Sequence, residues 1–209
     1  MRQFRFLFVA GFLALTACNH AKVANDANFT LAINEYLSKH GEACTVIGRQ
    51  FPVDLPLSES GRYGIEPKLV VLEQAGLVHA SDSIAVVHAM LDPLRGRGPA
   101  QPVKHYELTE AGRKYFQQIP SALGQTTGFC YGQKTVDAIV KWTEPVTTGV
   151  ARQAEVTYTY KIAGAATWAA RADVQQAFSD IQTTINGVSR TTEVAGLQLT
   201  SEGWEVPGQ

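Results

Sequence analysis

The residues able to do chemistry are few in this chain and widely separated. It contains five histidines, His20, His40, His79, His88 and His105, and three cysteines, Cys18, Cys44 and Cys130. No histidine pair has the spacing of metal ligands, so we expect neither a metal nor another cofactor. No Gly-x-Ser-x-Gly elbow or phosphate-binding loop occurs, and we assign no catalytic residue. His88 and His105 can face each other across a hairpin, but as strand surface residues rather than as metal ligands.

Cys18 ends a short N-terminal segment with the features of an export signal. Arg2 and Arg5 give a positive start, and an uncharged apolar run of about ten residues follows, too short for a membrane span. The run closes with Leu15-Thr16-Ala17-Cys18, which resembles the signal of bacterial lipoproteins. In that family a diacylglyceryl group is added to the cysteine, and cleavage makes that cysteine the new N-terminus. The resemblance implies a signal peptide over residues 1–17 and a membrane anchor on Cys18.

The residue after Cys18 bears on which membrane holds the chain. In the lipoprotein family an Asp at this place retains the protein in the inner membrane. Asn19 therefore implies the outer membrane, with the folded body facing the periplasm. The alternative is a plain secretory signal that is cut nearby, in which Cys18 has no special role. After Asn19 we expect a flexible tether, so that residues 18–28 join the lipid to the domain.

The remaining two cysteines form an even pair. If Cys18 carries lipid, Cys44 and Cys130 lie in an oxidising compartment, where such a pair predicts a disulfide. Two free buried thiols are the alternative. Neither cysteine belongs to a Cys-x-x-Cys pair, so a thioredoxin-like redox role has no support.

The first half of the chain, residues 29–123, predicts an α+β module. Apolar residues from Phe29 to Leu37 recur at helical spacing, with Asn28 as the cap and Gly41 as the left-handed end. A second helix starts at Pro67 and stops at Gly76, and a hairpin of strands follows. Thr109 caps a third helix, which we expect over residues 110–118.

Part of this half resembles a winged-helix domain. The run Leu69-Val70-Val71-Leu72-Glu73-Gln74-Ala75-Gly76-Leu77-Val78 is followed by Tyr106-Glu107-Leu108-Thr109-Glu110-Ala111-Gly112-Arg113. In that family a helix ends in Gly-Leu-Val, a hairpin wing follows, and Tyr-x-Leu-Thr-x-x-Gly opens the next helix. Relatives often bind DNA through a basic wing tip, where this chain has Arg95 and Arg97. An exported chain meets no chromosome, so we expect a structural module and no nucleic-acid partner.

The second half, residues 129–209, changes to the period of strands. Val136, Ala138, Val140 and Trp142 alternate with more polar residues, as do Val156, Tyr158, Tyr160 and Ile162. A helical stripe runs from Val174 to Ile185, and two further strands end the chain. The fold class is therefore α+β: a winged-helix-like module, then a β-β-α-β-β module whose antiparallel sheet is covered by that one helix. Residues 124–128 form the boundary.

Trp142, Tyr158 and Tyr160 offer the one candidate for a ligand groove. Aromatic side chains bury a large area and present a polar tip, which suits ligand binding. The commoner role of such residues is to fill the core beneath a covering helix. Both interpretations stay open on the sequence alone.

Composition narrows the function classes. Without Arg2 and Arg5 the chain has 16 basic and 19 acidic residues, so its surface does not attract nucleic acid in general. As a whole it resembles small uncharacterised lipoproteins of Gram-negative bacteria, through Trp142-Thr143-Glu144-Pro145, Tyr158-Thr159-Tyr160 and Gly203-Trp204. We expect a non-enzymatic binding or envelope-maintenance role, with an envelope protein or glycan as partner. The alternative is an envelope hydrolase whose site is assembled from dispersed residues.

Overall fold

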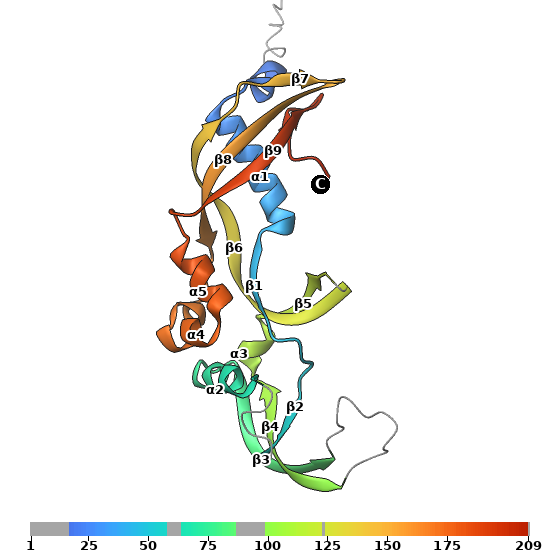
Figure 1. The fold of residues 1–209 in the computed structure, drawn as a ribbon, viewed down its shortest axis with the longest axis vertical. Coiled ribbons are helices and arrows are strands. Elements are labelled where there is room, and N and C mark those ends of the chain that lie inside the picture. Colours follow the sequence, from blue (N-terminus) through green and yellow to red (C-terminus); the bar gives the residue numbers. More distant parts are fainter. Residues whose placement is uncertain (1–16, 58–63, 87–98, 123, 209) are drawn as a thin grey trace, which may run out of the picture.

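A computed structural model describes residues 17–57, 64–86, 99–122 and 124–208, which form an elongated α+β body (Figure 1). The described helices are η1 (Ala17–Lys22), α1 (Asp26–His40), α2 (Glu66–Gln74), α3 (Glu110–Arg113), η3 (Thr167–Ala170), α4 (Ala172–Ala177) and α5 (Ser179–Asn186). The strands are β1 (Glu42–Val46), β2 (Val53–Pro56), β3 (Val78–Val86), β4 (Ala100–Leu108), β5 (Phe116–Ser121), β6 (Gly124–Trp142), β7 (Val146–Thr148), β8 (Ala151–Ala163), β9 (Thr192–Leu199) and β10 (Trp204–Glu205).

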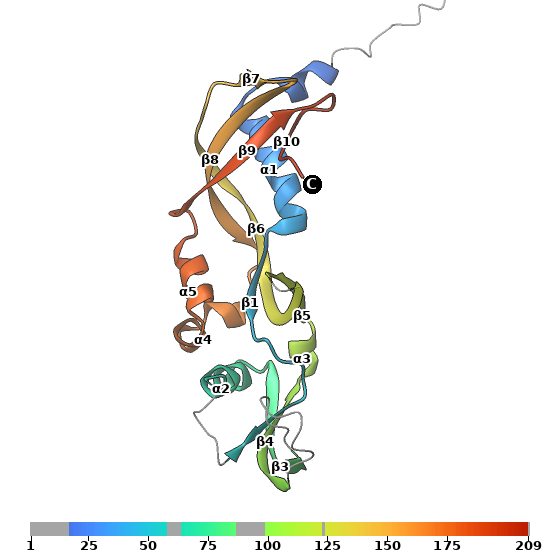
Figure 2. The same ribbon diagram turned by 45° about the vertical axis from the view of Figure 1, so that its right-hand side comes forward.

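The strands form two antiparallel sheets. The larger sheet has the order β1-β6-β8-β9-β10, with β5 beside β6 and β7 beside β8, and the smaller sheet has the order β2-β4-β3. Figures 1 and 2 place α1 and strands β7 to β10 at one end of the body and the smaller sheet at the other. The 19-residue strand β6 pairs with β1, β5 and β8 and so connects the middle of the body to the α1 end.

The start of the described chain is helical, whereas we expected a flexible tether over residues 18–28. Asn25 caps α1 by accepting a hydrogen bond of 2.8 Å from the backbone N–H of Asn28, the capping role expected of Asn28 itself. The side chain of Asn28 donates instead to the carbonyls of His20 and Val23, at 2.6 and 2.8 Å. These bonds satisfy backbone groups that a free tether would expose to water, and they hold η1 against α1.

Helix α1 covers one face of the larger sheet. Its buried residues, Phe29, Ala32, Ile33 and Leu37, meet buried residues of β6, β8, β9 and β10, and we call this set the α1 core. The ring of Phe29 makes edge contacts with Trp142 and Trp204, at centroid distances of 5.3 and 5.1 Å. The expected sheet beneath one helix is present, but a helix from the start of the chain covers it.

The helical stripe near residue 180, which we expected to be the cover, packs elsewhere. Val174, Phe178 and Ile181 lie in a second core with Leu69 and Leu72 of α2, which we call the α2 core. The stripe is divided between α4 and α5, because Phe178 between them has extended backbone angles. Since α1 already occupies the inner face of the sheet, this apolar surface is buried against α2 instead.

The Thr-x-x-Gly sequence, Thr109 to Gly112, connects the two ends of the β3–β4 hairpin. It is part of the motif that resembles a winged-helix domain. Thr109 donates from its side chain to the carbonyl of Gly76 at 2.7 Å and accepts from the N–H of Gly112 at 2.9 Å. A Cβ on Gly112 would lie 1.8 Å from the carbonyl oxygen of Leu77, so this position requires glycine. Gly76 has φ +74, the left-handed conformation expected at a helix end.

The third helix is much shorter than the predicted 110–118. Helix α3 ends at Arg113, and the chain continues as β5, which pairs with β6. The ring of Phe116 lies 5.3 Å from that of Phe129 and 5.2 Å from that of Phe51. Aromatic packing and the hydrogen bonds between β5 and β6 therefore replace the helical hydrogen bonds that we predicted up to residue 118.

Strand β6 also departs from the predicted pattern. Two irregularities in its pairing with β8 fall between Val136 and Lys141. Since each extra residue reverses the face that side chains occupy, the predicted alternation fails: Val136 is 5% exposed, but Val140 is 53% exposed. Residues 124–128, the predicted boundary, lie inside this strand.

Candidate functional site

The three aromatic residues proposed for a groove lie under α1. Tyr158 and Tyr160 are 5% and 3% exposed and belong to the α1 core, and Trp142 is half-buried against the ring of Phe29. The indole N–H of Trp142 donates to Asp26 Oδ1 at 2.9 Å. These positions match the core interpretation of the three residues rather than an open groove.

Tyr158 and Tyr160 belong to a polar network at the edge of the α1 core. The hydroxyl of Tyr158 donates to Glu193 Oε2 at 2.9 Å, and Lys134 Nζ lies 2.6 Å from Glu193 Oε1. Lys134 also stands over the ring of Tyr160, 4.3 Å from its centroid. Burial, and then the hydrogen bond to Glu193, raise the pKa of Tyr158 far above its ordinary value. A tyrosine that holds its proton this firmly is a structural donor and not a base.

Cys44 and Cys130 form a disulfide, as the sequence predicts. They are register partners on β1 and β6, with Cα atoms 3.9 Å apart and 86 positions between them in sequence. A carboxylate oxygen of Glu42 lies within 4.8 Å of both sulfurs. Because sulfurs joined to each other are not thiolates, this cluster cannot hold a metal while the bond is intact.

A histidine and an aspartate pair across the smaller sheet. His105 Nδ1 lies 2.6 Å from Asp54 Oδ1, and the two residues are register partners on β4 and β2. Ser81 on β3 is the partner of His105 on its other side, so the three stand in a row. Both Ser81 and His105 are described, and no hydrogen bond joins them, so the contact seen in this row is the His105–Asp54 pair. His88, the other expected neighbour of His105, lies outside the described residues, as do Arg95 and Arg97.

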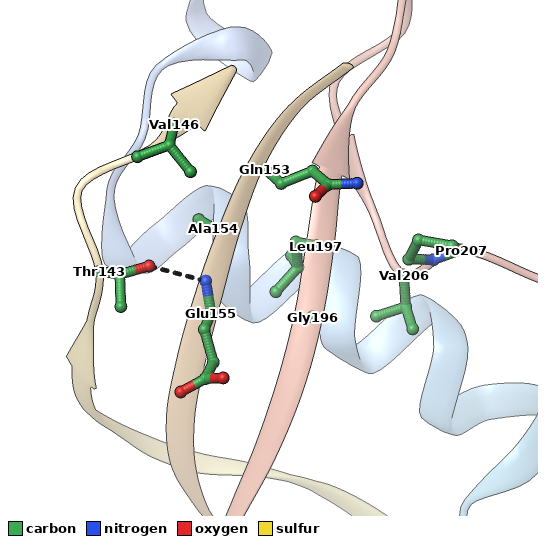
Figure 3. Close-up of a pocket in the computed structure, with 9 residues that line it drawn as sticks. All are labelled: Thr143, Val146, Gln153, Ala154, Glu155, Gly196, Leu197, Val206 and Pro207. Carbon is green, nitrogen blue, oxygen red and sulfur yellow. Dashed lines mark hydrogen bonds between the residues drawn. The ribbon is translucent and has the colours of Figure 1, made fainter. Parts of the chain in front are cut away.

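A groove of about 510 Å³ lies over β8 and β9 near the α1 end of the body (Figure 3). Gln153, Ala154 and Glu155 of β8 line it together with Gly196 and Leu197 of β9. One side is formed by Thr143, which precedes β7, and by Val146, the first residue of β7. The other side is formed by Val206 and Pro207 in the C-terminal segment.

Two local features keep the groove open. The backbone N–H of Glu155 donates to Thr143 Oγ1 at 2.9 Å, which fixes the bend between β6 and β7 against β8 (Figure 3). A Cβ on Gly196 would meet no heavy atom within 4 Å, so the floor of the groove has free space at this glycine.

The lining of the groove combines apolar residues with a few polar groups. Glu155 is the one carboxylate among its nine lining residues, and the amide of Gln153 is the other long polar group. The hydroxyl of Thr143 also lines the groove and accepts the hydrogen bond from the backbone N–H of Glu155. An apolar surface with one acceptor and one amide matches a ligand that has an apolar face and a hydrogen-bond donor. The sequence analysis missed this groove. A glycine within an alternating strand was the available signal.

The segment around the predicted anchor is held against the same end of the body. Residue 18 lies in η1, and the indole N–H of Trp204 donates to the carbonyl of Lys22 at 3.2 Å. A Cβ on Gly203 would lie 3.2 Å from the carbonyl oxygen of Ala21. Residues 1–16, which contain most of the predicted signal, lie outside the described residues. Within the described ranges, no helix combines the length and apolar character needed to cross a membrane.

Comparisons with known proteins found no match. No protein-family model matches the chain, and neither curated proteins nor solved structures gave a similar protein.

Proposed function

We propose that the chain is a lipid-anchored protein of the cell envelope with a non-enzymatic binding role. The observation that carries the anchor is Leu15-Thr16-Ala17-Cys18 at the end of an uncharged apolar run. The Cys44–Cys130 disulfide supports the same compartment, because such bonds persist in oxidising surroundings. Asn19 favours the outer membrane, with the body on the periplasmic side.

The binding role is assigned to the groove over β8 and β9. It is supported by the apolar lining with two polar groups and by the free space at Gly196. The partner would be an envelope protein or a glycan that presents an apolar face and a hydrogen-bond donor to Glu155.

For residues 65–118 we infer a winged-helix-like module with a structural role. Its support is the order α2, β3, β4, α3 and the bond from Thr109 to the carbonyl of Gly76. The module lies at the end of the body away from η1 (Figure 1). DNA binding would return as a candidate if fractionation placed the mature chain in the cytoplasm.

The anchor is tested by Cys18→Ser and metabolic labelling with a clickable fatty acid. We expect the unchanged chain to take up the label and to mature, and the variant to accumulate as an unlabelled precursor. Normal maturation of Cys18→Ser would contradict the lipid anchor and leave only a secretory signal.

The groove is tested by a photo-crosslinking amino acid at position 153 in living cells. We expect a crosslinked product that disappears when Gly196→Leu fills the floor of the groove. The matched control carries the same crosslinker at position 84, on β3 at the other end of the body. An identical product from position 153 with and without Gly196→Leu would contradict binding in the groove.

A further inference from the structure

We infer that the β7–β8 turn, defined here as Pro145 to Ala151 and so including β7 itself, rests on the bilayer that holds the lipid of Cys18. This inference depends on the proposed lipid anchor and adds an orientation to it. The turn contacts the interfacial layer of the phospholipid leaflet, where headgroups meet acyl chains.

The composition and exposure of the turn fit a lipid surface. Its sequence, Pro-Val-Thr-Thr-Gly-Val-Ala, has no charged residue. Val146 is 61% exposed and Val150 is fully exposed. In the described chain β7 pairs with β8 alone, so it is an edge strand, and exposed edges in water are ordinarily protected by charges. Exposed apolar side chains without charges are favourable at a membrane interface.

The register of the sheet places this turn beside the start of the chain. Arg152, which follows the turn, pairs with Leu199, so the β7–β8 turn and the β9–β10 turn lie at the same end of the sheet. The β9–β10 turn contains Gly203, which lies close to the carbonyl of Ala21 in η1. Figures 1 and 2 both show η1 beside β7.

The short path from the lipid to the body restricts how the protein can stand on the membrane. Residue 18 lies in η1, and the hydrogen bond from Trp204 fastens Lys22 to the body four residues later. A bilayer at η1 therefore comes within reach of the turn, while the smaller sheet points away from it. Glu144 and Arg152, both exposed, flank the uncharged run and would stay in the headgroup layer.

The test measures amide hydrogen exchange on vesicles of phosphatidylethanolamine and phosphatidylglycerol. One sample is the lipoprotein purified from membranes and reconstituted. The other is the chain from residue 18 onward, coupled through the Cys18 thiol to a maleimide phospholipid while Cys44 and Cys130 stay bonded. We expect the backbone amides of residues 146–151 to exchange severalfold more slowly on vesicles than in the uncoupled chain, and the amides of β3 to be unchanged.

Paired variants identify the side chains responsible. Val146→Asp combined with Val150→Asp should abolish the slow exchange on vesicles. Ile84→Asp, at a residue 73% exposed on β3, should leave it intact. Equal exchange with and without vesicles, or protection that survives both aspartates, would overturn the inference. Concentration-dependent protection without vesicles would overturn it in favour of a second copy.

The coupled sample separates this inference from the anchor. Its lipid is attached chemically, so it reports on the turn even if cells do not acylate Cys18. If cells add no fatty-acid label but the turn of the coupled sample exchanges slowly, the native anchor is refuted and the membrane contact is not. Normal labelling with fast exchange in both samples would refute the contact alone.

Discussion

Trp204 donates a hydrogen bond of 3.2 Å from its indole nitrogen to the carbonyl of Lys22, across 182 positions of the chain. Its ring also packs edge-on against Phe29 in the α1 core. One of the last residues of the chain therefore holds the segment that directly follows Cys18. In the proposed lipoprotein, the geometry between the lipid and the folded body would depend on this contact.

Trp204→Phe should loosen this attachment while it keeps an aromatic ring in the core. We expect a loss of about 1 kcal/mol in the free energy of unfolding, the typical net value of one hydrogen bond. Amide exchange should accelerate in residues 20–25. The matched control is Trp142→Phe, which removes the bond to Asp26 but no contact with η1. Equal acceleration in both variants would show that Trp204 has no special role there.

Gly112→Ala should be among the most harmful small substitutions. The added methyl group would meet the carbonyl oxygen of Leu77 at 1.8 Å, and backbone must move to relieve the clash. We expect a loss of about 3 kcal/mol or more, measured by urea unfolding. Gly196→Ala, where the same methyl group enters open space, should change stability little. Similar unfolding midpoints for the two variants would contradict the close approach of Gly112 to the carbonyl of Leu77.

Removing the disulfide should cost stability through the unfolded state. The bond closes 86 positions of chain, for which loop entropy gives about 4–5 kcal/mol as an upper value. Cys44→Ala combined with Cys130→Ala should therefore unfold at lower urea concentration, and reductant should then have no further effect. Two thiols that react with an alkylating agent in the native protein without reductant would show that the bond is absent.

Tyr158→Phe should alter stability at alkaline pH. Folding raises the pKa of Tyr158 above its ordinary 10.0, chiefly through burial and then through Glu193, so the folded state keeps the proton longer. The resulting stability is present below about pH 10 and is lost as the pH rises further, because the unfolded chain then ionises first. Between about pH 10 and 12 the variant should lose stability less steeply, by up to about 1.4 kcal/mol per pH unit. Parallel urea midpoints for both proteins across this range would contradict the assignment.

Local patterns in the sequence predicted individual elements well. The stripe from Phe29 to Leu37 forms a helix, and Gly76 ends another. Val156, Tyr158 and Tyr160 of β8 are buried as expected, but Thr159 between the two tyrosines is buried as well, so the alternation holds only in part. Pairing of Cys44 with Cys130 followed from their number and compartment. Each of these inferences needed only neighbouring residues or a simple count.

Long-range partners were the part that the sequence could not supply. Both α1 and the stripe around Phe178 are amphipathic, and nothing local decides which covers the sheet. The pairing of β5 with β6 overrides a helical pattern, and irregularities in β6 bring Val140 to the surface. The groove joins segments from Thr143 to Pro207, so it becomes visible only after the strands are paired.

The unbroken run of β6 sets a distance as well as a topology. Nineteen residues give this strand a contour length of about 60 Å along its curved path, from the α1 end of the body to the hairpin with β5. If Cys18 carries the proposed lipid, this strand would keep the β2–β4–β3 sheet away from the leaflet. Molecules that meet that sheet would then be selected by how far they stand from the membrane, before any chemical recognition begins.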